Sequence, residues 1–280
     1  MNTAEKFPIG VFDSGYGGLT VLKEFVETLP EYDFIYLGDN ARAPYGNRSF
    51  ETVYEFTFAC VQQLFNMGCR LVVLACNTAS AKALRNIQQN DLQNMDAALR
   101  VLGVIRPTTE IAGKISITKH IGIFATAGTV VSGSYPIEIK KFYPEVKVFQ
   151  EACPMWVPLI ENNEHSKPGA NYFVKQHIDN LLNQSGEIDT IILGCTHYPL
   201  LMNKIKQFLP ENIQLISQGE IVANSLKDYL MRHPEIENRC SKNSILKFYT
   251  TDSTEIFDTH ASFFFGKEVQ SEFMNSDITF

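Results

Sequence analysis

The 280-residue sequence lacks long apolar runs and an excess of basic residues. None of its apolar runs approaches the roughly 20 residues that a membrane-spanning helix needs. The first residues, MNTAEKFPIGVF, lack the basic-then-apolar order of a secretory signal. We therefore expect no membrane contact and a cytoplasmic location. Lysine and arginine number 24 against 31 aspartate and glutamate, for a net charge of -7, which disfavours binding of nucleic acid through its phosphates and favours a small-molecule partner.

The sequence also lacks paired cysteines. Its six cysteines are widely spread, with no C-x-x-C pair and no short secreted framework, so no disulfide scaffold or common zinc motif is indicated. In a reducing compartment we expect free thiols. A buried cysteine usually acts as a small apolar side chain, and we give this interpretation to Cys60, Cys69 and Cys240.

Short apolar runs alternate with longer amphipathic stretches, a pattern typical of an α/β fold with parallel strands covered by helices. The strands that we expect lie at residues 9–12, 34–37, 71–74, 101–104, 120–124, 146–149, 190–193, 213–216 and 245–249. The helices that we expect include residues 19–28, 50–66 and 79–89. Several strands run directly into small or polar residues. Because ligands bind beyond the carboxyl ends of parallel strands, we expect the chemistry there.

A strand followed by a polar loop recurs in the same order in both halves of the chain. VFDSGYGG precedes LACNTAS in the first half, and IFATAGTVVSGSY precedes LGCTHYP in the second. This repetition predicts two similar parallel-sheet α/β domains, with one cysteine on each side of the cleft between them. We expect the boundary near residues 104–109 and a return crossing near Gln218. The first domain would contain residues 1–104 plus 218–280, and the second residues 105–217.

The glycine-rich loop DSGYGGLT lies between an expected strand and helix, where backbone amides attract a phosphate or a carboxylate. A dinucleotide fingerprint is one alternative, and Asp39 imitates its ribose-binding acid. However, Thr20 stands where the third glycine belongs, and Asp13 would repel a phosphate. The nucleotide interpretation is therefore disfavoured. A plain strand-to-helix turn explains the glycines but not Asp13.

The next loop, LGDNARAPYG, combines residues with special backbone preferences. Pro44 fixes one torsion and Gly46 allows another, while Tyr45 between them offers a hydroxyl. Two interpretations stay open, contact with a substrate and a plain turn before a capped helix that begins near Ser49.

ACNT at residues 75–78 and GCTH at residues 194–197 each place a thiol where a strand ends and a helix begins. A helix end stabilises a thiolate there. Two cysteines in matching surroundings are harder to explain by burial than one, and His197 could act as the partner base of Cys195. Zinc ligation by Cys76, Cys195 and His197 is chemically possible. Their spacing matches no standard site and no fourth ligand is evident, so we expect no metal.

Six segments, in the order FDSGYGGL, YLGDNARAPYG, ACNTASA, ATAGTVVSGSY, CPMWVPLIE and GCTHYPLL, resemble the glutamate racemases of the cofactor-independent aspartate/glutamate racemase superfamily. The resemblance covers nearly the whole chain. Aspartate racemases of the superfamily usually carry a glutamate after the second Cys-Thr, so His197 favours glutamate as the substrate. There is one departure, because many members read GVIEP where this chain has Arg106 in GVIRP.

The resemblance implies an isomerase that interconverts L- and D-glutamate with Cys76 and Cys195 as two opposed bases. It implies no pyridoxal phosphate or other cofactor, a homodimer, and a supply of D-glutamate for peptidoglycan. Glu161 would assist His197, and Asp13 would serve Cys76. The positions that would contact the substrate or tune the thiols are Asp13, Ser14, Tyr45, Gly46, Asn77, Thr78, Thr126, Thr196 and His197.

Three other functions are alternatives to this interpretation. A nucleotide-dependent oxidoreductase is disfavoured by Thr20 and by the paired cysteines. A periplasmic amino-acid-binding module would need a signal peptide and would not need two thiols. A sister racemase that acts on aspartate, hydantoin or malonate remains open, since only a panel of substrates separates it from a glutamate racemase.

Overall fold

The computed structural model describes residues 6–275, in which the strands form two wholly parallel sheets. The large sheet has the order β10-β9-β2-β1-β3-β4 and contains β1 (Ile9–Asp13), β2 (Phe34–Gly38), β3 (Leu71–Leu74), β4 (Arg100–Gly103), β9 (Leu246–Thr250) and β10 (Ser271–Phe273). The small sheet has the order β6-β5-β7-β8 and contains β5 (His120–Ala125), β6 (Lys147–Ala152), β7 (Thr190–Gly194) and β8 (Gln214–Ile216). We call the units built on them the large-sheet domain and the small-sheet domain. The predicted α/β class with two parallel-sheet domains is confirmed.

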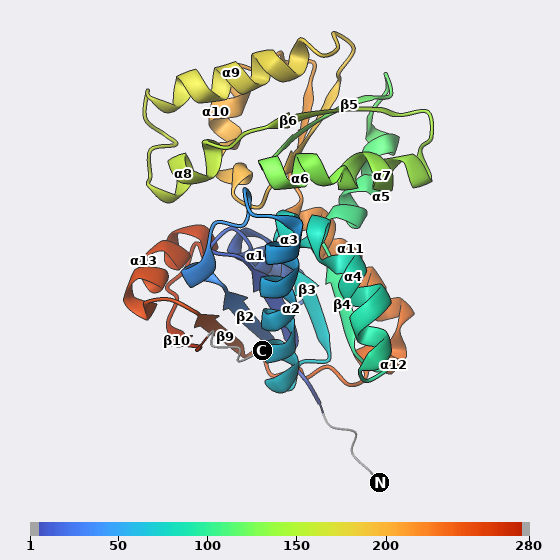
Figure 1. Ribbon diagram of the computed structural model, residues 1–280, viewed down its shortest axis with the longest axis vertical. Helices are drawn as coiled ribbons and strands as arrows, with labels where there is room; N and C mark the ends of the chain where they lie inside the picture. The colour runs from blue at the N-terminus through green and yellow to red at the C-terminus, as the bar shows by residue number, and fades with distance from the viewer. Residues whose placement is uncertain (1–5, 276–280) are drawn as a thin grey trace.

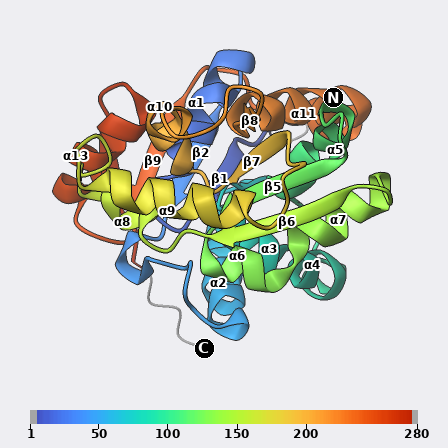
Figure 2. The same cartoon turned by 90° about the horizontal axis from the view of Figure 1, so that it is seen from above.

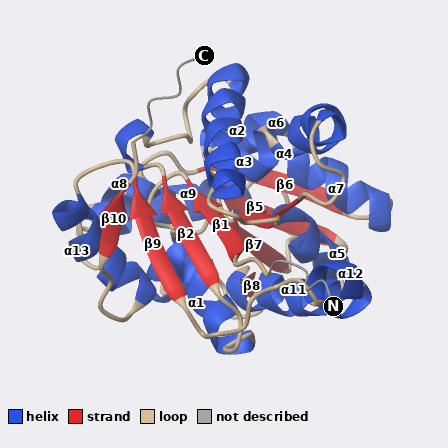
Figure 3. Ribbon diagram, turned by 90° about the horizontal axis from the view of Figure 1, so that it is seen from below, coloured by secondary structure: helices blue, strands red, loops and turns tan. Residues whose placement is uncertain are grey.

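Helices cover both faces of each sheet (Figures 1 and 3). Those of the large-sheet domain are α1 (Leu19–Thr28), α2 (Phe50–Asn66), α3 (Asn77–Lys82), α4 (Leu84–Asn86), α11 (Gly219–Arg232), α12 (Pro234–Glu237) and α13 (Thr254–Phe265). Those of the small-sheet domain are α5 (Ile105–Ile115), α6 (Ala127–Ser132), α7 (Ser134–Phe142), α8 (Trp156–Glu161), α9 (Ala170–Leu182) and α10 (Met202–Lys206). Seen from above, the small-sheet domain lies in front of the large-sheet domain (Figure 2). No helix within residues 6–275 is long and apolar enough to cross a membrane.

The central strands are apolar because both of their faces are buried. In β1, Val11 packs in the same cluster as Phe25 of α1, whereas the next residue, Phe12, packs in the cluster of Leu64 of α2. Successive side chains of a strand point to opposite faces, so one strand supplies both helix layers. The cluster around Val11 continues into the small-sheet domain through Trp156. The two domains are therefore packed against each other.

All nine expected strands are present, with ends that differ by a few residues. Val104 was expected to end β4, but its φ of -90° and ψ of -10° are helical and it caps α5. The single helix expected over residues 79–89 begins earlier, at Asn77, and divides after Lys82 into α3, α4 and a π-helical turn. The strand β10 was not expected. It has only three residues at the edge of the sheet, and two of them are exposed, so no apolar run marks it.

The order of the strands repeats the pattern seen in the sequence. β1 lies beside β3 in the large sheet, and β5 lies beside β7 in the small sheet. Asp13 ends β1 and Cys76 follows β3, while Thr126 follows β5 and Cys195 follows β7. Each domain thus brings a polar residue and a cysteine to the carboxyl edge of its sheet.

Candidate active site

Cys76 is the cap residue of α3, and its Sγ accepts a hydrogen bond from the amide of Ala79 at 3.4 Å. The hydroxyl of Ser14 lies 3.4 Å from the same sulfur. Burial and the nearby Asp13 carboxylate raise the pKa of the Cys76 thiol to about 12, although the bonds from Ser14 and Ala79 act in the opposite direction. The start of α3 thus favours the thiolate through the Ala79 amide, as expected, but burial has the larger effect and disfavours the charged form.

Asp13 is a buried carboxyl beside this first thiol. Its Oδ1 accepts a hydrogen bond from the amide of Gly15 at 2.8 Å. Burial raises the pKa of Asp13, while the positive charge of His197 and the amides of Gly15 and Gly18 lower it. A carboxyl with a raised pKa next to Cys76 is suited to exchanging a proton with that sulfur.

The second thiol has a cationic partner. The Sγ of Cys195 lies 3.8 Å from Nδ1 of His197, and the Nε2 of that ring lies 2.9 Å from Oε1 of Glu161 on α8. Burial disfavours the charged ring, but hydrogen bonds to Cys195 and Glu161 outweigh this and raise the pKa of His197 to about 10. His197 is therefore an imidazolium at neutral pH, where it stabilises negative charge on the Cys195 sulfur.

The two thiols therefore lie in opposite electrostatic surroundings. Cys76 lies beside a carboxylate and Cys195 beside an imidazolium. They also affect each other, since charge on Cys195 contributes to the raised pKa of Cys76. Negative charge on one sulfur therefore opposes ionisation of the other.

The loops of the two domains are joined by direct hydrogen bonds. The hydroxyl of Thr78 on α3 lies 2.9 Å from that of Thr126, which caps α6. The amide of Gly128 donates to the carbonyl of Gly46 at 2.7 Å. A side chain at Gly46 would have its Cβ 3.1 Å from Cβ of Thr126. The structure thus brings these four positions into direct contact where the two domains meet.

The glycine-rich loop packs directly against residues 195–197, the loop after β7 that carries the second thiol. A Cβ at Gly17 would lie 2.3 Å from Nδ1 of His197 and from Oγ1 of Thr196. The hydroxyl of Thr20, the residue that breaks the dinucleotide fingerprint, donates to the carbonyl of Thr196 at 2.9 Å. The glycine-rich loop therefore packs against protein atoms of the small-sheet domain, which further disfavours the nucleotide interpretation.

Tyr45 is buried, and its hydroxyl donates to Asp39. The same carboxylate accepts from Nε of Arg42 at 2.7 Å and from the Thr251 hydroxyl at 2.9 Å. The Tyr45 hydroxyl is therefore engaged within its own loop, which leaves the backbone around Tyr45 and Gly46 for the predicted substrate contact. Asp39 organises this loop through these bonds.

Asn77 is one of the positions predicted to contact the substrate or tune the thiols. Its Nδ2 donates to the hydroxyl of Tyr135 at 2.9 Å and to Oε1 of Gln218 at 2.8 Å. Within the described chain its Oδ1 is buried without a hydrogen-bond partner. Both N–H groups of the Asn77 amide are therefore engaged, and its oxygen is the part of the side chain still able to accept a hydrogen bond. Tyr135 and Gln218 were not expected at the site, because an isolated tyrosine or glutamine carries no signal in a sequence.

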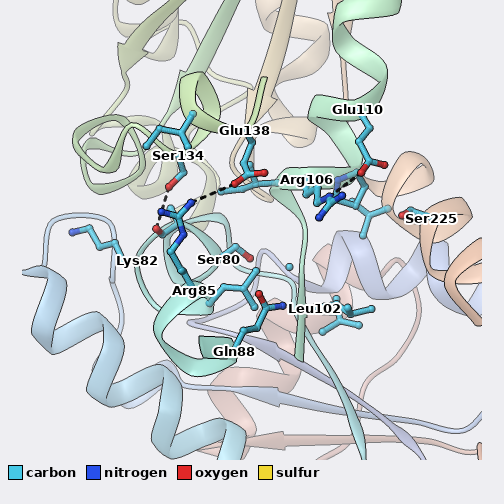
Figure 4. Close-up of a pocket in the computed structure, with 18 of the residues that line it drawn as sticks. Ser80, Lys82, Arg85, Gln88, Leu102, Arg106, Glu110, Ser134, Glu138 and Ser225 are labelled. Atoms are coloured by element: carbon cyan, nitrogen blue, oxygen red, sulfur yellow. Dashed lines mark hydrogen bonds and ion pairs between the residues drawn. The ribbon is translucent and has the colours of Figure 1, made fainter. Parts of the chain in front are cut away.

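A cavity of about 640 Å³ lies apart from this site, between α3, α4, α5, α7 and α11 (Figure 4). Its lining includes neither thiol. Arg106, which replaces the acid that many family members have at this position, lies on the wall of this cavity and forms an ion pair with Glu110 at 2.8 Å. A second ion pair on the wall joins Arg85 and Glu138 at 3.7 Å. The departure at Arg106 therefore affects this cavity and not the surroundings of the two sulfurs.

The fold and the site together define a class of protein, a two-domain α/β protein with one cysteine at the carboxyl edge of each parallel sheet. The chain belongs to the Asp/Glu/hydantoin racemase family, whose model matches residues 9–226. It is 40% identical over 263 residues to a glutamate racemase of Bacillus cereus, and the match covers 94% of each chain.

Solved structures agree with this membership. A glutamate racemase isoform from Bacillus anthracis superposes with a TM-score of 0.86 at 36% identity, covering 96% of this chain and 97% of that one. The Francisella tularensis glutamate racemase in complex with D-glutamate gives 0.85 at 30% identity, covering 97% and 98%. The predicted family and its class, an isomerase of the racemase type, are confirmed.

Proposed function

We propose that this enzyme is a glutamate racemase that moves protons between the α-carbon and the two opposed thiols of Cys76 and Cys195. The observation that carries the proposal is the contrast between the thiols, one beside Asp13 and the other beside His197. It is supported by the relatives named above, which are glutamate racemases that match this chain over nearly their whole length. The roles of individual residues below are part of this proposal.

Racemisation removes the α-proton from one face of the substrate and returns a proton to the other. The Cys195 thiolate, stabilised by His197, takes the proton of L-glutamate, and the Cys76 thiol gives its proton to the opposite face. The product is D-glutamate, with Cys195 now a thiol and Cys76 a thiolate. In the reverse direction the Cys76 thiolate takes the α-proton of D-glutamate and the Cys195 thiol gives its proton to the opposite face, which returns each sulfur to its starting form.

The α-proton is only weakly acidic, so the carbanion must be stabilised. The Thr78 and Thr196 hydroxyls and the loop amides supply hydrogen bonds to the α-carboxylate in a cleft with little water. The unpaired Oδ1 of Asn77 accepts from the substrate ammonium group. The walls of the proposed substrate site are completed by Ser14, Thr126 and the backbone of Tyr45 and Gly46.

The two thiols supply both proton transfers, so the proposed mechanism uses no cofactor. A metal would need three or four side chains that converge on one point. Within residues 6–275 no group of three or more histidine, cysteine, aspartate or glutamate side chains is placed to hold one.

We also propose that the enzyme supplies D-glutamate for peptidoglycan, as the resemblance implies, and that it works in the cytoplasm as a homodimer. The six free, buried thiols fit a reducing compartment. We propose domain boundaries at residues 1–104 plus 218–280 and 105–217, because β5 to β8 form the small sheet and the remaining described strands form the large one. The cytoplasmic location and the dimer stay predictions.

Circular dichroism of each glutamate enantiomer incubated with the protein tests the proposed function. The signal should decay to zero from either side, because the two enantiomers have equal free energy in water. The kcat/KM values for the two enantiomers must then be equal. L-aspartate should keep its signal under the same conditions. Decay of the aspartate signal with glutamate unchanged would instead identify an aspartate racemase.

Substitution of Gly17 tests the contact between the two thiol loops. Gly17→Ala places a Cβ 2.3 Å from the His197 ring and should push the loops apart, which lowers kcat/KM on the order of a hundredfold. Gly15→Ala is the matched control in the same loop, because its Cβ meets only Asn40 Nδ2 at 3.9 Å and Glu161 Oε1 at 4.0 Å. It should remain near the wild type. Equal kcat/KM values for the two variants would contradict the predicted role of this contact.

A further inference from the structure

A closed triangle of side-chain hydrogen bonds connects the two domains behind the thiols. Asn77 Nδ2 donates to the Tyr135 hydroxyl at 2.9 Å and to Gln218 Oε1 at 2.8 Å, and Gln218 Nε2 donates to the Tyr135 hydroxyl at 2.8 Å. All three side chains are at most 3% exposed. We call this set of three residues the amide–phenol bridge. Buried and mutually bonded polar groups of this kind hold their neighbours in one arrangement.

The amide–phenol bridge rests on both segments where the chain passes between the domains. Gln218 Nε2 also lies 3.2 Å from the Val104 carbonyl and 3.0 Å from the Thr108 hydroxyl. Val104 follows the last strand that the chain contributes before it enters the small-sheet domain, and Gln218 precedes α11, where it returns. One side chain therefore ties together the outgoing and the returning segment.

The same bridge touches both thiol loops. Asn77 directly follows Cys76 at the start of α3. On the other side, the ring of Tyr135 lies against Gly194, the residue before Cys195, so closely that a Cβ at Gly194 would be 3.1 Å from Tyr135 Cε2. Burial and, to a smaller degree, the charge of Cys195 raise the pKa of Tyr135, so its hydroxyl keeps its proton and accepts from both amides.

We propose that Tyr135 and Gln218 are positioning residues for the racemisation, an inference that rests on the function proposed above. They hold Asn77, and with it the Cys76 loop, at a fixed place relative to Cys195. A two-base reaction needs both sulfurs within proton-transfer reach of one carbon at the same time, so a small displacement of one loop has a large effect. By holding both N–H groups of Asn77, the bridge also leaves its Oδ1 as the one polar atom of this side chain without a partner among the described residues.

Tyr135→Phe tests the proposal, because it removes the hydroxyl that both amides use while keeping the ring against Gly194. In deuterated water, the first thiol exchanges the proton that it has removed for a deuteron from the solvent, and a carbanion whose second thiol is displaced takes this deuteron back. The racemisation kcat should fall about ten- to a hundredfold. The ratio of α-exchange without inversion to racemisation should rise, with a smaller change in KM. Gln218→Met, which removes the other corner of the bridge, should change the ratio in the same direction.

Tyr143→Phe is the matched control. Its hydroxyl donates to the Glu110 carbonyl at 2.7 Å, where α7 packs on α5, so its loss also costs a hydrogen bond between helices but should leave the exchange ratio unchanged. The same ratio in the wild type and in folded Tyr135→Phe or Gln218→Met overturns the positioning role. Absence of racemisation by the wild type instead overturns the proposed function itself, so the two failures are distinguishable.

Discussion

The Cys76→Ala variant is expected to lose racemisation and still exchange the α-proton of L-glutamate. The remaining Cys195 thiolate, stabilised by the His197 imidazolium, can take a proton from its own face and return a deuteron there. No acid then serves the other face. Because an acid or base in the transition state contributes about 10²- to 10⁴-fold, kcat/KM for racemisation should fall by at least that factor.

The Cys195→Ala variant should show the mirror behaviour and label only D-glutamate. Its exchange depends on the thiolate of Cys76, whose pKa is raised to about 12 by burial and by Asp13. The ionised fraction of Cys76 increases with pH, so exchange should be slow at pH 7 and become faster at alkaline pH. Exchange by Cys76→Ala should already be present at neutral pH. The two variants thus differ in the enantiomer that they label and in their pH dependence.

Proton NMR in deuterated water, followed by chiral separation of the glutamate, measures both quantities. Cys240→Ala is a suitable control, since this cysteine is also buried but its thiol donates to the carbonyl of Ile236 away from the cleft. It should racemise like the wild type. Labelling of both enantiomers by Cys76→Ala or Cys195→Ala, or racemisation that survives in either, would show that the two-cysteine assignment is wrong.

Most of the fold could be predicted from the sequence because the central strands are buried on both faces. Val11 and Phe12 must both be apolar when each faces a different helix layer, and such a run is visible without a structure. The edge of the sheet gives no such signal. β10 pairs through its backbone to β9, and two of its three side chains are exposed, so its sequence resembles a loop.

The two thiols could be found from the sequence because each directly follows a strand and precedes polar residues. The contacts made by the segments that pass between the two domains could not be found in this way. Gln218 reaches Tyr135 over a separation of 83 residues and Asn77 over 141, and nothing near these residues indicates the pairing. The pKa of the Cys76 thiol could not be predicted from the sequence pattern either. The helix start at Cys76 suggested a thiolate, whereas the burial that only the fold reveals dominates its pKa.

His197→Asn should lower kcat/KM at pH 7 on the order of tenfold to a hundredfold, because the imidazolium that stabilises the Cys195 thiolate is lost. The folded-state pKa of His197 is about 10, above its ordinary value of 6.5. The ring is therefore charged across the neutral range and loses its proton as the pH rises through about 10. A thiol without such a partner ionises only near pH 8.5, roughly. The activity of the variant should accordingly recover in part between pH 7 and 9.

Steady-state rates across this pH range, measured from both enantiomers, test the prediction. Glu161→Gln keeps a hydrogen-bond acceptor near the ring but removes the charge, so its loss should be intermediate. His177→Asn is the matched control, since His177 pairs with Glu151 at 2.7 Å between α9 and β6, and its pH profile should follow the wild type. In every variant that racemises, the two kcat/KM values must stay equal, because the equilibrium constant is unity. An unchanged pH profile in His197→Asn would mean that the Cys195 thiolate does not depend on this imidazolium.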